Sequence, residues 1–177
     1  MPKVIRLAET ADTNAIKQLI EVSARKLGGQ FYKKTTIEQA LKGAFGVDSQ
    51  LIQDRTYYVV LKQNQFIACG GWSFRKTLFG SDTNNLRNPA KLNPETEAAK
   101  IRAFFIHPDY SRQGLGKKLL NICESAAKNH GFKQCQLMAT LSGIDFYRKN
   151  AYFGDKYIEH SMNKSDKITF LPMQKNL

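Results

Sequence analysis

The order of apolar and polar residues along the chain predicts an alternation of strands and helices. Strands are predicted where charged and apolar residues alternate, or where β-branched and aromatic residues cluster. Helices are predicted where apolar residues recur every three or four positions, beginning after a capping residue such as Thr10 or Asp12. In chain order the predicted elements are a strand over 3–8, a helix over 16–27, a shorter helix from 35 or 36 to about 43, strands over 56–61, 66–74 and 98–107, a helix over 115–130, a strand over 133–138, a short helix running into a strand over 144–153, and strands over 157–160 and 168–173.

Two features of this pattern constrain the sheet. The strand, helix and strand over 98–138 form a crossover unit, which requires the two strands to be parallel and the connection right-handed. Gly70 and Gly71 lie inside the second strand of a predicted hairpin, where they indicate a bulge or a close approach of another backbone. Residues 76–97 are polar and have no period, so we expect either a mobile flap over a functional site or a plain surface loop.

The stretch from Ile101 to Leu120 organises the rest of the chain. An apolar strand ends at His107-Pro108, a short basic loop with two glycines follows, and an amphipathic helix begins. Glycines before a helix let the free N–H groups of the first turn converge on one point, where the helix dipole also favours an anion. The alternative is an ordinary loop before a surface helix. The spacing matches neither a Walker loop nor a dinucleotide-binding fingerprint.

This stretch resembles the signature of the GNAT superfamily of N-acetyltransferases, an Arg/Gln-x-x-Gly-x-Gly/Ala loop after a strand that ends in His-Pro. The resemblance implies that acetyl-coenzyme A is the cosubstrate, with its pyrophosphate held by the loop amides and its pantetheine arm paired with the preceding strand. Ser111 stands where the family has its first Arg or Gln, with Arg112 beside it. The residues implied to contact the coenzyme here are Phe104, Phe105, Ile106, Ser111, Arg112, Gln113, Gly114, Leu115, Gly116 and Lys117.

Residues 144–153 are similar to the second signature of the same family, which contains a Phe-Tyr pair followed by a Lys. Phe146, Tyr147 and Lys149 fall on matching positions, whereas Ala151 replaces a Gly. The resemblance implies that Phe146 and Lys149 contact the coenzyme. It also implies that Tyr147 is the general acid that protonates the departing thiolate. The alternative for Tyr147 is a packing role.

The residues around the acceptor are less clearly marked. The resemblance implies that the early helices and the hairpin form the acceptor wall, and the candidates are Phe31, Tyr32, Phe45, Trp72 and Phe74. Each of these could instead be a core residue. Lys100 occupies the position at which many family members have a Glu that acts as the general base. This leaves Glu95 and Glu97 as bases acting through water or as solvated charges, and Lys100 or Arg102 as a contact for an anionic acceptor group.

Composition limits the class of protein. A chain of 177 residues with 42% hydrophobic content is expected to form one domain over 1–177. The net charge of +12 indicates an anionic partner, whether a polyphosphate, a nucleic acid or a surface. The three cysteines and three histidines have no metal-ligand spacing, so we expect no metal and reduced thiols. Without a signal peptide or membrane span, a cytoplasmic protein is expected.

These observations predict an α/β (α+β) fold with a single GNAT-type domain. Its sheet is expected to be mixed, mostly antiparallel, six- to seven-stranded and flanked by about four helices. The expected activity is direct transfer of an acetyl or short acyl group from acetyl-CoA to a primary amine of a small molecule, peptide or protein. A coenzyme A sensor without turnover and a basic nucleic-acid-associated protein, such as one that acetylates aminoacylated RNA, remain alternatives. The resemblance also allows a homodimer.

Overall fold

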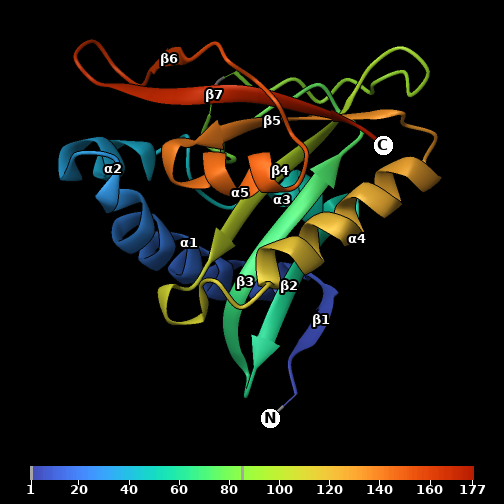
Figure 1. The fold of residues 1–177 in the computed structure, drawn as a ribbon. Coiled ribbons are helices and arrows are strands. Elements are labelled where there is room, and N and C mark those ends of the chain that lie inside the picture. Colours follow the sequence, from blue (N-terminus) through green and yellow to red (C-terminus); the bar gives the residue numbers. More distant parts are fainter. Residues whose placement is uncertain (1, 85) are drawn as a thin grey trace.

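The computed structural model describes residues 2–84 and 86–177; residue 85, which belongs to the polar 76–97 segment, and residue 1 lie outside it. In the described part, seven strands form one mixed sheet in the order β1-β2-β3-β4-β5-β7-β6 (Figure 1). Every neighbouring pair is antiparallel except β4 and β5, which are parallel. The strands are β1 (Val4–Leu7), β2 (Tyr57–Lys62), β3 (Gln65–Ser73), β4 (Ala99–Ile106), β5 (Gln134–Thr140), β6 (Ile158–Ser161) and β7 (Lys167–Asn176).

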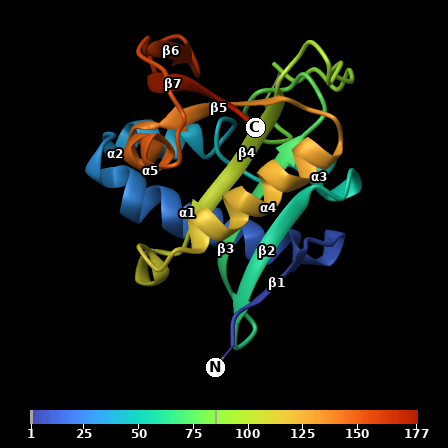
Figure 2. The same ribbon diagram turned by 45° about the vertical axis from the view of Figure 1, so that its right-hand side comes forward.

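Five α-helices of the described chain cover the two faces of this sheet: α1 (Thr13–Leu27), α2 (Lys34–Ala40), α3 (Ser49–Gln53), α4 (Leu115–Asn129) and α5 (Ile144–Lys149). The buried residues of α1, α2 and α3 share a core with Cys69 of β3. The buried residues of α4 pack against Ala68, which precedes Cys69 in β3. Buried residues of α4 and α5 also share a core with Trp72 and Ile101. Because successive strand residues point to opposite faces, α1–α3 and α4–α5 lie on opposite sides of the sheet. Figure 2 shows β2–β4 between α1 and α4.

The amphipathic pattern of α1 explains its position. Ile16, Leu19 and Ile20 repeat at helical spacing and are buried on the sheet. Asp12 occupies the N-cap position, but its carboxylate accepts from the Glu9 backbone N–H at 2.8 Å and pairs with Arg6 at 2.6 Å. The predicted cap therefore ties β1 to the start of α1 instead of capping the first turn.

The parallel pair β4 and β5 separates along its length. Among the described residues, the two strands have register partners only at Ala99 with Cys135 and Lys100 with Gln136. Beyond Lys100 the two strands diverge, which leaves the β5-facing edge of β4 without a strand partner (Figure 1). An unpaired edge presents backbone N–H and C=O groups that an extended ligand can bind.

The predicted fold class is confirmed, including the parallel crossover over 98–138 and the bulge at Gly70-Gly71. One observed helix was not predicted, and one predicted strand was wrong. The helix α3 was not expected, because five residues are too short to display a period. The strand predicted after α5 is only an isolated bridge between Phe153 and Gln174, since Tyr152 turns into the core and Phe153 is 58% exposed.

The segment 76–97 contains no helix or strand in its described part, apart from one isolated bridge between Arg75 and Lys91. It is nevertheless bound to the rest of the chain, because Ser81 N donates to Gly43 O at 2.8 Å and Asp82 N to Val47 O at 3.1 Å. No helix in the described residues combines the length and the apolar character needed to cross a bilayer.

Candidate functional site

A cavity of about 750 Å³ opens where β4 and β5 separate. Its volume is within the range of small-molecule sites, roughly 300–1,000 Å³. Its walls come from β4, the loop before α4, α5, the end of α1, and the segments 44–46 and 78–80. Elements from both faces of the sheet therefore meet around the unpaired edge of β4.

A bulge in β4 forms the floor of this cavity. The register between β3 and β4 shifts between Cys69 and Gly71, and Ala103 has a φ of 54°. The side chain of Phe104 occupies the space above Gly70, where an added Cβ would lie 2.7 Å from the ring. Tyr57 Oη donates to Ala103 O at 3.2 Å from the buried side. The bulge is thus supported from its buried side by Tyr57, and its peptide groups point in directions that differ from those in a regular strand.

The loop before α4 provides an anion-binding geometry. Arg112 and Gly114 both have positive φ, 58° and 78°, which turns the chain sharply into the helix. In the described part of the chain, no side chain caps α4, and the first helical bond is from Lys118 N to Gly114 O at 3.1 Å. The amides at the start of the helix are therefore free to bind a ligand, and the positive end of the helix dipole adds to the attraction for a phosphate.

Two cationic side chains, Lys117 and Lys149, also line this part of the cavity, from α4 and α5. Gly116 brings α4 close to α5, since an added Cβ would lie 3.1 Å from the ring of Phe146. The loop, the helix start and α5 thus form one positively charged end of the cavity.

Tyr147, which lies between Phe146 and Lys149 on α5, also reaches the cavity. It is 9% exposed, and its ring packs edge-on against Phe146 and Tyr152 at centroid distances of 5.0 and 5.7 Å. Burial raises the pKa of its phenol above the usual value, and the nearby Cys123 adds to this shift. The group is therefore protonated throughout the neutral range and can act as a proton donor.

The structure brings together almost all of the predicted coenzyme-binding residues. The lining includes Phe104, Phe105, Ile106, Ser111, Arg112, Gly114, Leu115, Gly116, Lys117, Phe146 and Lys149, and it also includes Tyr147, the predicted acid. Gln113 does not; its amide donates to Asp109 O at 3.3 Å and accepts from Lys3 Nζ at 2.9 Å. A contact of Gln113 with a ligand would require these bonds to break.

The predicted acceptor wall divides into two groups. Phe31, Tyr32 and Phe45 line the cavity. Trp72 and Phe74 lie outside its lining and pack instead against His130 at the end of α4, both at 5.3 Å between ring centroids. They are core residues because the inward face of β3 at this point meets α4.

The two glutamates suggested as bases lie away from the cavity. Glu95 and Glu97 line a separate depression with Lys133 and Asn176. Glu97 accepts from Asn93 N at 2.8 Å, which contributes most to lowering its pKa. Lys100 is also buried outside the cavity lining, where its Nζ donates to Gln136 Oε1 at 2.7 Å. Lys100 therefore does not contact an acceptor.

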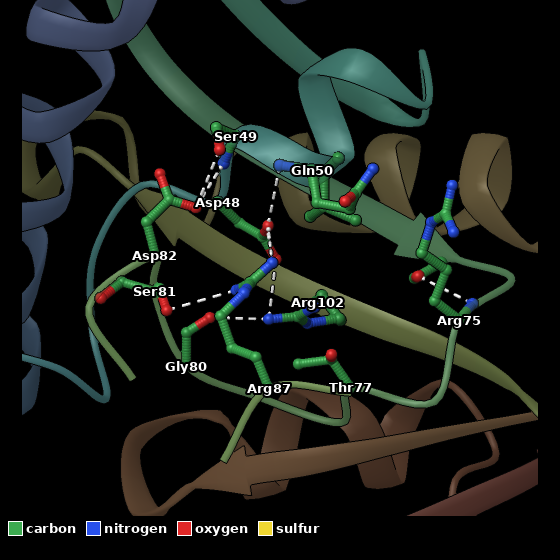
Figure 3. A network of polar contacts seen from close by, with 12 residues as sticks. Asp48, Ser49, Gln50, Arg75, Thr77, Gly80, Ser81, Asp82, Arg87 and Arg102 are labelled. Carbon is green, nitrogen blue, oxygen red and sulfur yellow. Dashed lines mark hydrogen bonds and ion pairs between the residues drawn. The ribbon is translucent and has the colours of Figure 1, made fainter. Parts of the chain in front are cut away.

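Arg102 lines the cavity and belongs to a buried ionic network (Figure 3). Its Nη2 lies 2.7 Å from the fully buried carboxylate of Asp48 and donates to Gly80 O at 2.6 Å. Arg87 Nη2 donates to the other oxygen of Asp48 at 2.9 Å. Figure 3 shows the two guanidinium groups converging on Asp48 from β4 and from the 76–97 segment. The network fixes the backbone at Gly80 next to the floor of the cavity.

Sequence reasoning missed several lining residues, namely Leu27, Leu78, Phe79, Tyr110 and Phe170. Phe79 lies in a segment with no period, so no pattern assigns its direction. Phe170 is in a strand of β-branched and aromatic residues, where a core role is expected for every apolar position. Within residues 2–84 and 86–177, no three His, Cys, Asp or Glu side chains gather in a way that could hold a metal ion.

Comparisons with known proteins agree with this geometry. A family model described as the acetyltransferase (GNAT) family matches residues 17–152. Among solved structures, the PaiA N-acetyltransferase of Thermoplasma acidophilum in complex with coenzyme A has a TM-score of 0.68 at 15% identity, with 100% of both chains covered. A GCN5-related N-acetyltransferase of Rhodopseudomonas palustris has a TM-score of 0.72 at 16% identity, covering 100% of this chain and 97% of the other.

The ribosomal-protein-S18-alanine N-acetyltransferase of Escherichia coli is also similar, with a TM-score of 0.61 at 13% identity, covering 99% of this chain and 94% of that one. A search of curated protein sequences gives no significant match. At these identities the solved structures establish a common fold.

Proposed function

The chain belongs to the acetyltransferase (GNAT) family, and from this we infer that it moves an acetyl or other short acyl group from coenzyme A to a primary amine. The observation that carries this proposal is the uncapped start of α4 beside the unpaired edge of β4, both lining one cavity. The first binds a pyrophosphate, and the second binds an extended amide-containing arm. A similar fold, the Thermoplasma PaiA enzyme, was crystallised with coenzyme A, which supports the choice of ligand.

In the proposed complex, the chain positions the thioester in the gap between β4 and β5. Loop amides at Gly114–Gly116 hold the pyrophosphate, with Arg112, Lys117 and Lys149 near the phosphates. A backbone N–H of the bulged strand, at Phe105 or Ile106, polarises the thioester oxygen as charge develops on it. These groups fix the donor without a covalent bond to the protein, which supports direct transfer.

The proposed chemical step is attack of a neutral amine on the thioester carbon. The N–C bond forms, the C–S bond breaks, and the thiolate leaves as coenzyme A. Tyr147 donates its phenolic proton to the departing sulfur, the amine nitrogen releases its surplus proton to solvent, and the phenolate is reprotonated from solvent, so the products are the amide and the free thiol. Its raised pKa supports this role, because the group holds its proton until a strongly basic sulfur develops.

Two measurements test the proposal together. Isothermal titration calorimetry with coenzyme A is expected to give one site, and a thiol-release assay with acetyl-coenzyme A is expected to show turnover with a panel of primary amines. Binding with no thiol release from any amine would identify a sensor instead of an enzyme. Absence of binding would overturn the assignment of the cavity.

A further inference from the structure

The side of the cavity that faces α1–α3 is built from apolar side chains. We call this surface the aromatic wall. It consists of Leu27, Phe31, Phe45, Phe79, Phe105 and Phe170. These residues come from the end of α1, three connecting segments, β4 and β7, so five phenylalanines distant in sequence converge on one surface. Phe45 packs edge-on against Phe105 at 6.0 Å, and Phe79 lies 5.3 Å from Phe170.

The aromatic wall and Tyr147 lie on opposite sides of the sheet. Phe45, Phe79, Phe105 and Phe170 belong to the core beneath α1–α3, whereas Tyr147 belongs to the core beneath α4 and α5. A thioester held in the gap between β4 and β5 therefore has the proposed acid on one side and the aromatic wall on the other. An amine that enters along the wall attacks the thioester carbon from that face, and the sulfur then departs on the side of Tyr147.

Two polar side chains on this side are engaged by the protein. Tyr32 Oη donates to Thr169 O at 2.7 Å and accepts from Leu141 N at 2.9 Å. Arg102 is paired with Asp48 and bonded to Gly80 O. Neither side chain offers a free acceptor to an ammonium group, and the other polar lining side chains near α1, Ser23 and Gln30, are uncharged. This side therefore has no free anionic partner for an ammonium group, and recognition depends mainly on apolar contact.

Carboxylates are almost absent from the cavity. Asp145 is the single acidic side chain among the described lining residues, and it is exposed in the first turn of α5, next to Phe146 at the positively charged end. A polycationic acceptor would leave its additional ammonium groups desolvated and unpaired against the aromatic wall, which is costly. The net charge of +12 repels such an acceptor further.

We propose that the acceptor is a primary amine carried on an aromatic or similarly apolar group. This inference rests on the proposed acyl transfer and names its substrate class. It also accounts for the lack of a carboxylate base, because an apolar wall disfavours the charged form of the amine and lowers its pKa. Desolvation on binding thus supplies the neutral nucleophile, and the ammonium proton is lost to solvent as the substrate enters.

The test compares acceptors of similar length in the thiol-release assay. We expect kcat/KM for 2-phenylethylamine, benzylamine and tryptamine to exceed that for 1,4-diaminobutane and spermidine by about tenfold or more. A preference for the polyamines, or equal values for the two groups, would overturn the inference. Coenzyme A binding without turnover of any apolar amine would also overturn it while leaving the donor site intact. Loss of coenzyme A binding would instead overturn the proposed function.

A pair of variants tests the position of the wall. Phe31 is 53% exposed at the cavity, and Phe153 is 58% exposed outside it. Phe31→Asp places a carboxylate on the acceptor side, so the ratio of kcat/KM for 2-phenylethylamine over 1,4-diaminobutane should fall by about tenfold. Phe153→Asp should leave this ratio unchanged. An equal effect of both variants would contradict the assignment of the aromatic wall.

Discussion

Tyr147 is the residue whose chemistry depends most directly on its surroundings. Its ring is enclosed by Phe146 and Tyr152, while its position in the cavity lining leaves it able to meet a ligand. Burial raises its pKa, so the phenol is a weak acid in the resting protein. It becomes an effective donor only to a thiolate that is forming, which is the point in the reaction where a proton is needed.

The substitution Tyr147→Phe removes this proton and leaves the packing of the ring in place. We expect kcat for acyl transfer to fall by about 10²–10⁴, with the Kd for coenzyme A unchanged by calorimetry. The matched control is Tyr152→Phe, because the Tyr152 hydroxyl donates to Glu124 at 2.9 Å and lies outside the cavity lining. Full activity of Tyr147→Phe would eliminate the proposed acid.

Asp48 is a second residue whose role depends on its surroundings, because its charge holds two arginines in place. It is fully buried between Arg87 and Arg102, and it is the N-cap residue of α3. Removal of its charge leaves the guanidinium of Arg102 buried without an opposite charge, a loss of about 3–5 kcal/mol for pairs of this kind. The anchored backbone at Gly80 should loosen as well, and with it the neighbouring Phe79 of the aromatic wall.

We therefore expect Asp48→Asn to lower the free energy of unfolding by about 3 kcal/mol or more and to raise KM for the amine more than KM for acetyl-CoA. Urea denaturation and steady-state kinetics measure the two effects. Asp54→Asn is the control, since Asp54 pairs with Arg75 at 2.6 Å and neither residue lines the cavity. A similar rise in KM for the amine in the control would argue against the anchoring role.

Single residues could be predicted from the sequence only where a motif fixes their place. The loop glycines and Tyr147 are in this class, because their spacing is set by one turn and one short helix. Arg102 is not, since its partner Asp48 is in a distant segment, and a charge in a strand gives no signal of burial. Trp72 was a candidate for the acceptor wall but packs in the core, because the sequence does not indicate which of the two an aromatic residue near the end of a strand faces.

At the scale of elements, α4 is the part in which local structure and binding are most tightly coupled. The helix starts at an uncapped turn with Gly114 at a φ of 78° and ends near Gly131 at a φ of 94°. Both glycines permit a left-handed conformation that costs other residues about 1–2 kcal/mol. Only the first of them is at the cavity.

Because both glycines have a positive φ and only Gly114 lines the cavity, they provide a matched pair of variants. Gly114→Ala and Gly131→Ala should each lower the free energy of unfolding by about 1 kcal/mol, because space for a Cβ exists at both sites. Gly114→Ala should in addition weaken coenzyme A binding about tenfold, since relief of the strain turns the first amides of α4 away from the pyrophosphate. Thermal denaturation and calorimetry separate the two effects. Equal coenzyme A affinities in both variants would contradict phosphate binding at this turn.

Elements were predicted well where the period was long and the punctuation clear. The helix α1 ends at Leu27 and α4 at Asn129, next to the glycines that indicated both ends. The helix α3 was missed because its five residues depend on tertiary contacts, with Leu51 and Ile52 buried against β3. The separation of β4 from β5 also leaves no trace in the sequence, because it depends on how two faces of the sheet are filled.

At the scale of the whole molecule, the charge distribution connects the positive net charge to the site. The chain carries a net charge of +12, and Arg112, Lys117 and Lys149 line one end of the cavity. Arg102, the remaining cation of the lining, is paired with Asp48. The positive potential is therefore concentrated at the uncapped turn of α4, opposite the aromatic wall, so that donor and acceptor are drawn to different ends of one cavity.

This arrangement predicts that salt affects the donor and not the acceptor. The association rate constant for coenzyme A should fall about tenfold between low salt and 0.5 M NaCl, because the screening length shortens to a few ångströms and removes long-range attraction for the phosphates. Pantetheine, which lacks the phosphates, should show a nearly flat dependence, as should KM for 2-phenylethylamine. Stopped-flow fluorescence of Trp72 or of a labelled coenzyme A measures the rates.

Lys117→Gln should reduce the salt slope for coenzyme A, whereas Lys156→Gln, at an exposed position outside the cavity lining, should reduce it less. Equal slopes for coenzyme A and pantetheine would mean that the positive charge serves another partner.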